Sequence, residues 1–327
     1  MTSDLRDELQ QSLAADYVLE DELPRGGMSR VFLAVERSLN RKVVLKVLDP
    51  ELAATLSAER FKREIALAAR LQHPHIVPLL HAGAVDGKLF YSMPFVDGES
   101  LRELMSRERP MSIDRISQIL LEIAGALDFA HTEGVVHRDI KPENVMFFHG
   151  QAVVLDFGIA KAVSNATAAS GVSASTPPRL TLQGTSLGTP TYIAPEQAAG
   201  DPTLDHRADI YSVGCVAYEM LTGHPPFRGK SPQQVMIAHA KEAPEPIGRR
   251  RPDAPAVLLK LVMKCLEKSP DHRPQRAADI VRALRPASSG GNGSLRSLLQ
   301  RMPWWLPWAL AVVSTAAAIA LAFTRRA

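Results

Sequence analysis

Residues 136–145 read VHRDIKPENV, and residues 153–158 read VVLDFG. This stretch carries two carboxylates, an amide and an ammonium group on a loop between two short apolar runs: Asp139, Asp156, Asn144 and Lys141. The side-chain oxygens of Asn144 and Asp156 suit Mg²⁺, which takes a few oxygen ligands from a protein alongside the oxygens of a nucleotide. Asp139 is then left to accept a hydroxyl proton. The stretch therefore predicts a site for a metal ion, a phosphate and a hydroxyl acceptor.

The order His-Arg-Asp-x-Lys-x-x-x-Asn with Asp-Phe-Gly behind it resembles the catalytic and metal-binding loops of eukaryotic-type (Hanks-type) serine/threonine protein kinases, in particular bacterial membrane-anchored members. The alternative, in which these charges only solvate a surface loop, does not account for so many matching positions. The resemblance covers about residues 17–286. It implies an α+β fold of two lobes, a small β-rich N-lobe with one main helix and a larger, mostly helical C-lobe. It also implies ATP and Mg²⁺, or Mn²⁺, as cofactors.

The bulk composition is that of an ordinary globular protein, with 46% hydrophobic residues, a net charge of +3 and a pI near 8.9. No run of Lys and Arg is interleaved with aromatic residues, so we expect no nucleic-acid partner. Cys215 and Cys265 lie in apolar helical patterns and are predicted to be buried thiols in a reducing cytosol. The first residues lack a basic start and an apolar run, so no signal peptide is expected.

Residues 1–16 are predicted to form an amphipathic helix, because leucines recur every four residues among charged side chains. A strand from residue 17 then leads to a glycine turn, whose backbone N–H groups could approach phosphate oxygens. The resemblance makes this turn a nucleotide-binding flap and assigns nucleotide contacts to Gly26, Gly27 and Val31. Pro24 replaces the first glycine of the family pattern, and because proline fixes φ and lacks an N–H, we expect a stiffer flap.

Lys46 lies in the apolar strand 42–48, where an unpaired ammonium group would be costly to bury. The resemblance makes Lys46 the residue that holds the α and β phosphates and pairs with Glu64 on the helix 57–71. Glu59 is the alternative partner. Glu64 is favoured because Phe61, Ile65 and Ala68 lie near it on an inward face, whereas Glu59 falls in the first turn.

The hinge at residues 94–98 joins an N-lobe at 17–93 to a C-lobe at 99–286. By resemblance Met93 borders the adenine pocket, and the backbone of Pro94 and Val96 bonds the adenine edge. In the catalytic loop the resemblance makes Asp139 the residue that orients and deprotonates the acceptor hydroxyl and Lys141 the residue that neutralises the moving phosphoryl group, while Asn144 and Asp156 hold Mg²⁺. Lysine at position 141 is the choice of Ser/Thr-directed members.

Residues 162–188 are rich in Ser, Thr, Ala, Gly and Pro and read as a loop without periodicity. An inert linker is the alternative, but the position of this loop after Asp-Phe-Gly resembles that of an activation segment. Its candidate phosphorylation sites are Thr185 and Thr181 first, then Ser186, and Arg138 could pair with the phosphate. Thr189 is expected to bond Asp139 and Lys141 and to help select Ser/Thr substrates.

Two structural supports also follow from the resemblance. Glu196 needs a partner if it is buried, and the resemblance names Arg273. Asp209 opens a very apolar helix and is expected to brace the backbone of the catalytic loop.

The C-terminal tail is predicted to contain a flexible juxtamembrane linker at 287–302, a transmembrane helix at 303–324 and a short tail at 325–327. Three tryptophans gather at one end of the apolar span like an interface belt. A buried soluble helix is the alternative. Because a kinase needs ATP, we expect the N-terminal domain in the cytoplasm, with no room for an outer sensor domain. Ser314 and neighbouring alanines would allow helix packing, and so a homodimer.

The sequence therefore predicts a serine/threonine protein kinase that transfers the γ-phosphate of Mg-ATP to protein substrates and to its own activation segment. The alternative is a nucleotide-binding pseudokinase that acts as a membrane-anchored scaffold, and Pro24 is the one feature in its favour. A small-molecule kinase is less favoured, because the segment 188–196 that shapes a peptide groove is intact.

Overall fold

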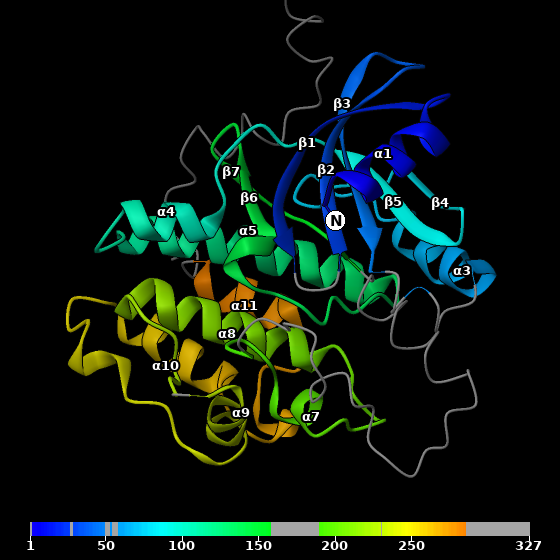
Figure 1. Ribbon diagram of the computed structural model, residues 1–327. Helices are drawn as coiled ribbons and strands as arrows, with labels where there is room; N and C mark the ends of the chain where they lie inside the picture. The colour runs from blue at the N-terminus through cyan, green and yellow to red at the C-terminus, as the bar shows by residue number, and fades with distance from the viewer. Residues whose placement is uncertain are drawn as a thin grey trace, which may run out of the picture. The chain divides into compact units, whose positions relative to one another are not determined.

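The computed structural model describes residues 2–26, 29–49, 53, 58–157, 190–229 and 231–285. These residues all belong to one compact unit, Met1–Arg285, which Figure 1 shows as a β-rich lobe above a helical lobe. The predicted linker at 287–302 and the predicted membrane span at 303–324 lie outside the described residues. Among the described helices, none combines the length and the apolar character that a membrane crossing requires.

The small lobe is built on a five-stranded antiparallel sheet with the order β1-β2-β3-β5-β4. Its strands are β1 (Tyr17–Gly26), β2 (Ser29–Glu36), β3 (Arg41–Leu48), β4 (His81–Val85) and β5 (Lys88–Pro94). Asp86 and Gly87 join β4 to β5 with φ angles of +46° and +74°, the left-handed pair that a tight two-residue hairpin turn requires. The Asp86-Gly87 dipeptide therefore forms the tight turn that this residue pair favours.

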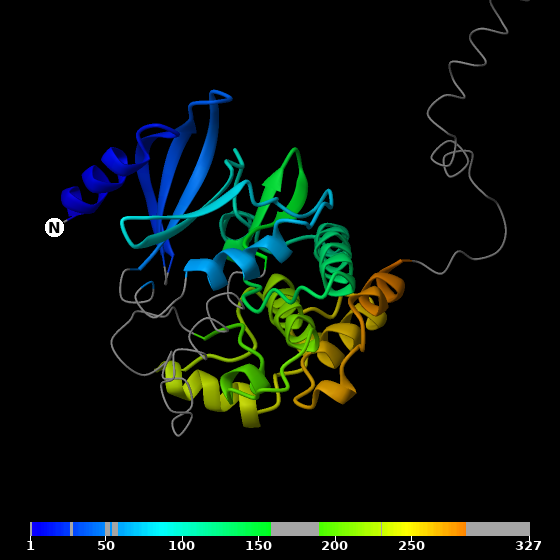
Figure 2. The same ribbon diagram turned by 90° about the vertical axis from the view of Figure 1, so that its right-hand side faces the viewer.

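Both faces of this sheet are covered. Strand alternation sends Val31, Val44 and Tyr91 to the face that packs with Phe61 and Ile65 of α3 (Ala58–Ala68). The intervening residues Phe32, Leu45 and Phe90 form the opposite face, which packs with Leu9 and Leu13 of α1 (Thr2–Leu13). Figure 2 shows α1, in the darkest blue, on the side of the sheet away from α3. The predicted N-terminal amphipathic helix is thus part of the core of the small lobe.

Pro24 lies in β1 beside an irregularity in the strand pairing. The register of β1 with β2 changes by one residue between Leu23, which faces Val31, and Gly26, which faces Ser29. Such a bulge removes a regular ladder position, and this is where a strand tolerates a residue that lacks an N–H. The departure from the family pattern at Pro24 is therefore compatible with a formed β1–β2 hairpin.

The large lobe surrounds α8 (Arg207–Thr222), in which every residue from Ala208 to Leu221 is buried. A helix that is buried on all sides is a core helix, as its very apolar sequence predicts, and the polar side chains of Asp209, Ser212 and Glu219 are buried with hydrogen-bond partners. Around it lie α5 (Ile113–Thr132), α10 (Ala256–Cys265) and α11 (Ala277–Leu284). The remaining elements are α4 (Leu101–Arg107), η1 (Pro142–Asn144), β6 (Val145–Phe148), β7 (Gln151–Val154), α7 (Pro195–Ala198), α9 (Pro232–Lys241), η2 (Ile247–Arg249) and η3 (Pro270–His272).

Two features place the catalytic loop between the lobes. The hydroxyl of Ser112 caps α5 by accepting a hydrogen bond from the Arg115 N–H at 3.2 Å, and α5 then runs directly toward residues 136–145. On the far side of the loop, β6 and β7 form a hairpin. The Val154 N–H donates to the His75 carbonyl at 2.9 Å, and the Val77 N–H donates to the Val154 carbonyl at 3.0 Å. The hairpin is therefore tied to the segment between α3 and β4 of the small lobe.

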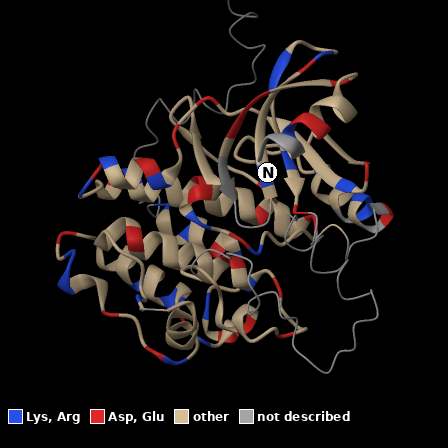
Figure 3. Cartoon of the chain, in the orientation of Figure 1, with Lys and Arg blue, Asp and Glu red and all other residues tan. Residues whose placement is uncertain are grey.

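Surface charge of both signs is spread over this unit. In Figure 3 basic segments (blue) and acidic segments (red) are interspersed along both lobes.

Cys215 and Cys265 are 0% and 2% exposed, and burial raises the pKa of both thiols, as expected for core cysteines.

Candidate active site

Three side chains of the catalytic loop are hydrogen-bonded to one another. The Asp139 carboxylate accepts from Lys141 Nζ at 2.7 Å and from Asn144 Nδ2 at 3.0 Å, and Asn144 Nδ2 also donates to the Asp139 carbonyl at 2.7 Å. The Asp139 side chain is 51% exposed, whereas Asn144 is 7% exposed. Asn144 therefore holds the loop from within, while the carboxylate of Asp139 stays accessible to an incoming hydroxyl group.

Asp209 of α8 supports this loop through its backbone. Its carboxylate accepts from the N–H groups of His137 and Arg138 at 2.8 and 2.7 Å, and its side chain is 0% exposed. The ring of His131 adds a third bond at 2.8 Å. Burial alone would raise the pKa of Asp209, but the hydrogen bond and charge of His131 and the bond from the Arg138 amide hold the pKa below its usual value. The bracing expected for Asp209 is thus present.

The loop backbone bends sharply at Arg138. Its φ angle of +68° lies in the left-handed region, which costs free energy for a residue with a side chain. The Asp209 bond to the Arg138 N–H and a 2.7 Å bond from Gln197 Nε2 to the Arg138 carbonyl hold this conformation from both sides. Gln197 was not a candidate from the sequence, because its contact with Arg138 spans 59 positions of the chain.

His137 links the catalytic loop to the end of β7. Its Nε2 lies 2.7 Å from the Leu155 carbonyl, and its Nδ1 lies 3.2 Å from the Asp139 N–H. Since a carbonyl only accepts, Nε2 carries the hydrogen and Nδ1 accepts from Asp139. The ring also lies edge-on to Phe157 with the centroids 4.7 Å apart. One buried imidazole therefore connects the two halves of the motif.

Lys46 of β3 and Asp156, which follows β7, form an ion pair between the two lobes. The Lys46 ammonium group forms an ion pair with Asp156 Oδ2, and the two side chains are 14% and 16% exposed. Burial raises the pKa of the Asp156 carboxyl, but the charge and hydrogen bond of Lys46 outweigh it, so the pKa lies below the usual value. The φ angle of Asp156 is +64°, a second left-handed residue in this site.

Tyr91 is a site residue that the sequence analysis missed. Its hydroxyl donates to Asp156 Oδ1 at 3.2 Å, and its residue is 3% exposed. Burial, and then the negative charge of Asp156, raise the pKa of this phenol well above its usual value. Tyr91 faces Lys46 in the β3–β5 register, so strand alternation places it on the same face, but nothing in the sequence pairs it with Asp156.

The side chains present fit a magnesium ion that is shared with a nucleotide. Asn144 uses its amide nitrogen on Asp139, so it offers its oxygen, and Asp156 offers a carboxylate. Among the described residues no group of three or more His, Cys, Asp or Glu could hold a metal unaided. This is the pattern expected for Mg²⁺, which is usually bound by one or two carboxylates together with substrate phosphates rather than by a protein cage.

The structure describes most of the other residues that were predicted to contact the nucleotide. Val31 is 8% exposed in β2 and faces Lys46 in the neighbouring strand, while Met93 is 2% exposed in β5. Pro94 ends β5 as a partner of Val43, so the first hinge residue belongs to the sheet. Val96 packs partly on the same apolar cluster. Gly26 ends β1 opposite Ser29, and Gly27 lies outside the described residues.

Glu64 falls in α3, but its side chain lies outside the described residues, so its predicted ion pair with Lys46 stays a prediction. Its neighbours Phe61, Ile65 and Ala68 are buried as expected, and Glu59 is exposed. Within the described part of the chain, the acidic partner of Lys46 is Asp156.

The activation-segment candidates Thr181, Thr185, Ser186 and Thr189 also lie outside the described residues, which resume at Pro190. Beyond that point the ion pair expected between Glu196 and Arg273 is present. Both guanidinium Nη atoms bond the carboxylate, at 2.6 and 2.8 Å, and the Arg273 side chain is 0% exposed.

Arg102 forms a second network that the sequence analysis missed. Its Nε donates to Glu143 at 2.8 Å, its Nη1 donates to Glu219 at 2.7 Å, and its Nη2 bonds the hydroxyl of Tyr192. These partners come from the catalytic loop, from α8 and from the segment after Pro190. Arg102 therefore connects α4 to the catalytic loop, to α8 and to the segment that contains Tyr192.

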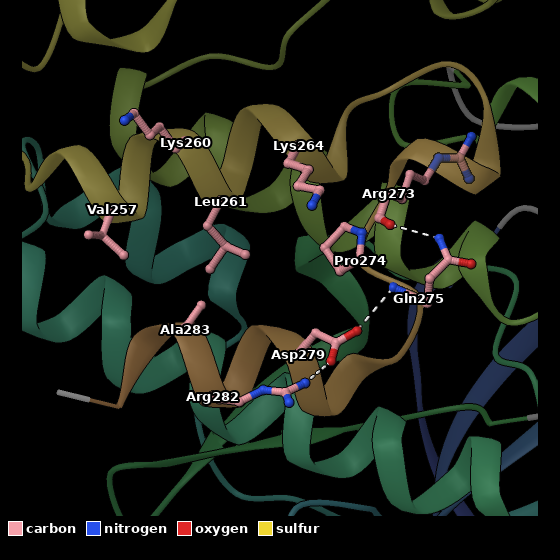
Figure 4. A pocket seen from close by; sticks show the side chains of 10 residues that line it. All are labelled: Val257, Lys260, Leu261, Lys264, Arg273, Pro274, Gln275, Asp279, Arg282 and Ala283. Atoms are coloured by element: carbon pink, nitrogen blue, oxygen red, sulfur yellow. Dashed lines mark hydrogen bonds and ion pairs between the residues drawn. The ribbon is translucent and has the colours of Figure 1, made fainter. Parts of the chain in front are cut away.

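A groove of about 500 Å³ lies between α10 and α11, away from the catalytic loop. Figure 4 shows Val257, Leu261 and Ala283 along its apolar part, with Lys260 and Lys264 on one rim and the Asp279–Arg282 ion pair on the other. The groove contains none of the residues assigned to the metal, the nucleotide or the hydroxyl acceptor. Arg273, which lines the groove, also bonds Glu196 through its guanidinium group.

Comparison with known proteins agrees with this geometry. Residues 17–283 match the family model described as the protein kinase domain. The chain is 42% identical over 276 residues to the serine/threonine-protein kinase PknB of Mycolicibacterium smegmatis, a match that covers 83% of this chain and 42% of that protein. It is 40% identical over 286 residues to the serine/threonine-protein kinase pkn3 of Myxococcus xanthus, covering 84% of this chain and 50% of that protein. The chain thus spans half or less of the length of these relatives.

A solved structure shows the same fold at lower sequence identity. The crystal structure of Rad53 1–466 in complex with AMP-PNP superimposes with a TM-score of 0.66 and 22% identity. The match covers 86% of this chain and 68% of that one.

Proposed function

Because the chain belongs to the protein kinase family, we propose that it is a serine/threonine protein kinase that transfers the γ-phosphate of ATP to Ser or Thr hydroxyl groups. The observation that carries the proposal is the joining of Asp139, Lys141 and Asn144 into one hydrogen-bonded group, together with the ion pair between Lys46 and Asp156. Similarity to bacterial serine/threonine kinases supports the choice of acceptor.

Asp139 acts on the acceptor hydroxyl. Its exposed carboxylate accepts the hydroxyl proton as the hydroxyl oxygen forms a bond to the γ-phosphorus, and the bond from that phosphorus to the β–γ bridging oxygen breaks to release ADP. Lys141 places a positive charge beside Asp139, where it can neutralise the moving phosphoryl group. Asn144 keeps both residues in place through its bonds to Asp139.

On the nucleotide side, Lys46 binds the α and β phosphates. This assignment requires the ammonium group to exchange part of its contact with Asp156 for phosphate oxygens. Asp156 and Asn144 would hold Mg²⁺ together with nucleotide oxygens, and the bound ion would supply positive charge for the phosphates. Val31, Met93 and the backbone around Pro94 and Val96 enclose the adenine.

We also propose that a helix at 303–324 anchors the protein in a membrane, with the kinase domain in the cytoplasm and a homodimer formed through Ser314 and its neighbouring alanines. The support is the uncharged run of this segment, its tryptophans and the arginines on either side. Sodium carbonate extraction of membranes that contain the full chain tests the anchor, because extraction of the protein into the soluble fraction would contradict it. Cross-linking of the full chain and of Ser314→Leu in membranes tests the dimer.

The catalytic proposal is tested with the full chain in detergent and ³²P-labelled Mg-ATP, beside Asp139→Asn. Transfer to myelin basic protein and to the kinase itself is expected only for the parent protein, with phosphate on Thr181, Thr185 or Ser186 by mass spectrometry. ATP binding without transfer in either protein would contradict the proposal and favour the pseudokinase reading, and Pro24→Gly would then test whether the flap is the cause.

A further inference from the structure

A buried chain of hydrogen bonds connects α8, α9 and the segment that follows the activation loop. The hydroxyl of Tyr211 lies 2.9 Å from Nδ1 of His239, and Nε2 of His239 lies 3.0 Å from the carbonyl oxygen of Thr191. A carbonyl oxygen can only accept, so the His239 hydrogen is on Nε2, and Nδ1 accepts from Tyr211. In His239, therefore, Nε2 is the hydrogen-bond donor and Nδ1 is the acceptor.

The surroundings of His239 keep its ring neutral. The residue is 0% exposed, and the ring of Phe227 meets it edge-on with the centroids 4.9 Å apart. Burial, followed by the positive charge of Lys268, lowers the pKa of His239 to about 4. Lys268 Nζ also donates to the His239 carbonyl at 2.7 Å, so the backbone of this residue is held as well.

The neighbouring carbonyl is held in the same way. The hydroxyl of Ser212, on α8, donates to the carbonyl of Tyr192 at 2.7 Å. Two successive carbonyls, those of Thr191 and Tyr192, are thus fixed by side chains from two helices of the large lobe. The segment lies two residues after Thr189, the predicted contact to the acceptor.

We propose that His239 is a positioning residue for the protein acceptor, which holds the Thr191 carbonyl and so sets the path of the backbone on which the acceptor binds. The inference rests on the proposed kinase activity and deepens it by assigning a residue outside the catalytic motifs to recognition of the acceptor. The chemistry requires one neutral donor at Nε2, and the hydroxyl of Tyr211 fixes that tautomer from behind.

An ordinary core histidine would fill the same volume and affect stability alone. The two readings differ in one measurable way. If His239 only fills space, its loss lowers the melting temperature and leaves the kinetic constants of the folded enzyme unchanged. If it positions the acceptor segment, its loss raises KM for the acceptor, while KM for ATP and the hydrolysis of ATP by water stay near the parent values.

The test uses the full chain in detergent with myelin basic protein as the acceptor. His239→Ala removes both bonds, whereas His239→Gln can still place an amide N–H near the position of Nε2. Tyr211→Phe removes only the hydroxyl that fixes the tautomer. The matched control is Tyr218→Phe on the same helix, because the Tyr218 hydroxyl bonds the Glu245 carbonyl and not the acceptor segment.

We expect KM for the acceptor to rise about tenfold in His239→Ala, equivalent to about 1.4 kcal/mol for one lost buried hydrogen bond. His239→Gln should recover most of this loss, Tyr211→Phe should show a smaller rise, and Tyr218→Phe should match the parent. An unchanged acceptor KM in folded His239→Ala would overturn the inference. If that variant does not fold, equal values for Tyr211→Phe and Tyr218→Phe would overturn it.

Failure of the proposed function gives a different result. A parent protein that binds ATP but transfers no phosphate to any acceptor removes the premise and with it the inference. Transfer by the parent that is insensitive to His239 and Tyr211 leaves the kinase assignment in place and overturns only the role of His239.

Discussion

Replacing Arg273 with methionine should destabilise the large lobe strongly. The Arg273 guanidinium group donates to both carboxylate oxygens of Glu196, at 2.6 and 2.8 Å. It also donates to the carbonyls of Glu267 at 2.8 Å and of Arg207 and Lys268 at 2.9 Å each. Methionine has a similar length and removes every one of these donors, so the substitution tests the bonds more than the packing.

The magnitude follows from the burial of the pair. The side chains of Arg273 and Glu196 are 0% and 10% exposed, so the loss of arginine leaves a carboxylate and three carbonyls without these donors. Removing one partner of a buried ion pair costs about 3–5 kcal/mol. At about 2–4 °C per kcal/mol for a domain of this size, the melting temperature should fall by roughly 6–20 °C.

The assay is thermal unfolding of the full chain in detergent, followed by circular dichroism. The control is Asp271→Asn, which removes the negative charge from the ion pair of Arg207 with an aspartate that is 80% exposed. Exposed pairs contribute little to stability, so this variant should melt within about 3 °C of the parent. The double variant Arg273→Met with Glu196→Gln should lose less stability than the sum of the two single variants, because no buried charge is left alone.

A melting temperature of Arg273→Met within 3 °C of the parent would refute the reasoning. So would strict additivity in the double variant, since that result would mean that the two side chains do not interact. The first result would show that the lobe repacks or admits water around Glu196 at little cost.

Three further predictions concern other parts of the molecule. Asp139→Asn should lower the transfer of labelled phosphate by at least about a hundredfold, since general-base catalysis contributes that much, with a melting temperature near that of the parent because the side chain is 51% exposed. The pKa of Asp209 is lowered in the folded protein, so its contribution to stability is present above the unfolded value of about 3.9 and is lost as the pH falls through the folded pKa; urea unfolding from about pH 2 to pH 7 should show a larger loss of stability in the parent than in Asp209→Asn, which keeps the other carboxyls of lowered pKa, such as Asp156. Leu9 is 1% exposed, so Leu9→Ala should cost about 2–5 kcal/mol in urea unfolding without changing KM for the acceptor, and an unchanged stability would mean that α1 does not pack on the sheet.

Local chemistry in the sequence predicted most of the elements that place the site. Asp86-Gly87 is a hairpin signal at the β4–β5 turn, Ser112 is a helix-capping residue at the start of α5, and the run after Asp209 forms the very apolar helix that was expected. These features can be read along the chain because turn geometry, capping and periodicity involve residues within a few positions of one another.

The catalytic motif could also be predicted from the sequence, because Asp139, Lys141 and Asn144 lie within six residues and bond to one another over a short separation along the chain. The position of α1 was harder to judge. Its leucine spacing predicted an amphipathic helix, but a helix alone does not indicate the surface that will cover its apolar face. Only the folded sheet offered that surface, through Phe32, Leu45 and Phe90.

By itself the sequence determined the family, the order of the elements and the identity of the reacting groups, because each depends on residue types at short and regular spacing. The tertiary structure decided which distant groups meet. Lys46 bonds a carboxylate 110 residues away, Tyr91 reaches the same carboxylate, and His239 holds a carbonyl 48 residues before it. Such contacts depend on how whole helices and sheets pack against one another, and no local pattern along the chain records that packing.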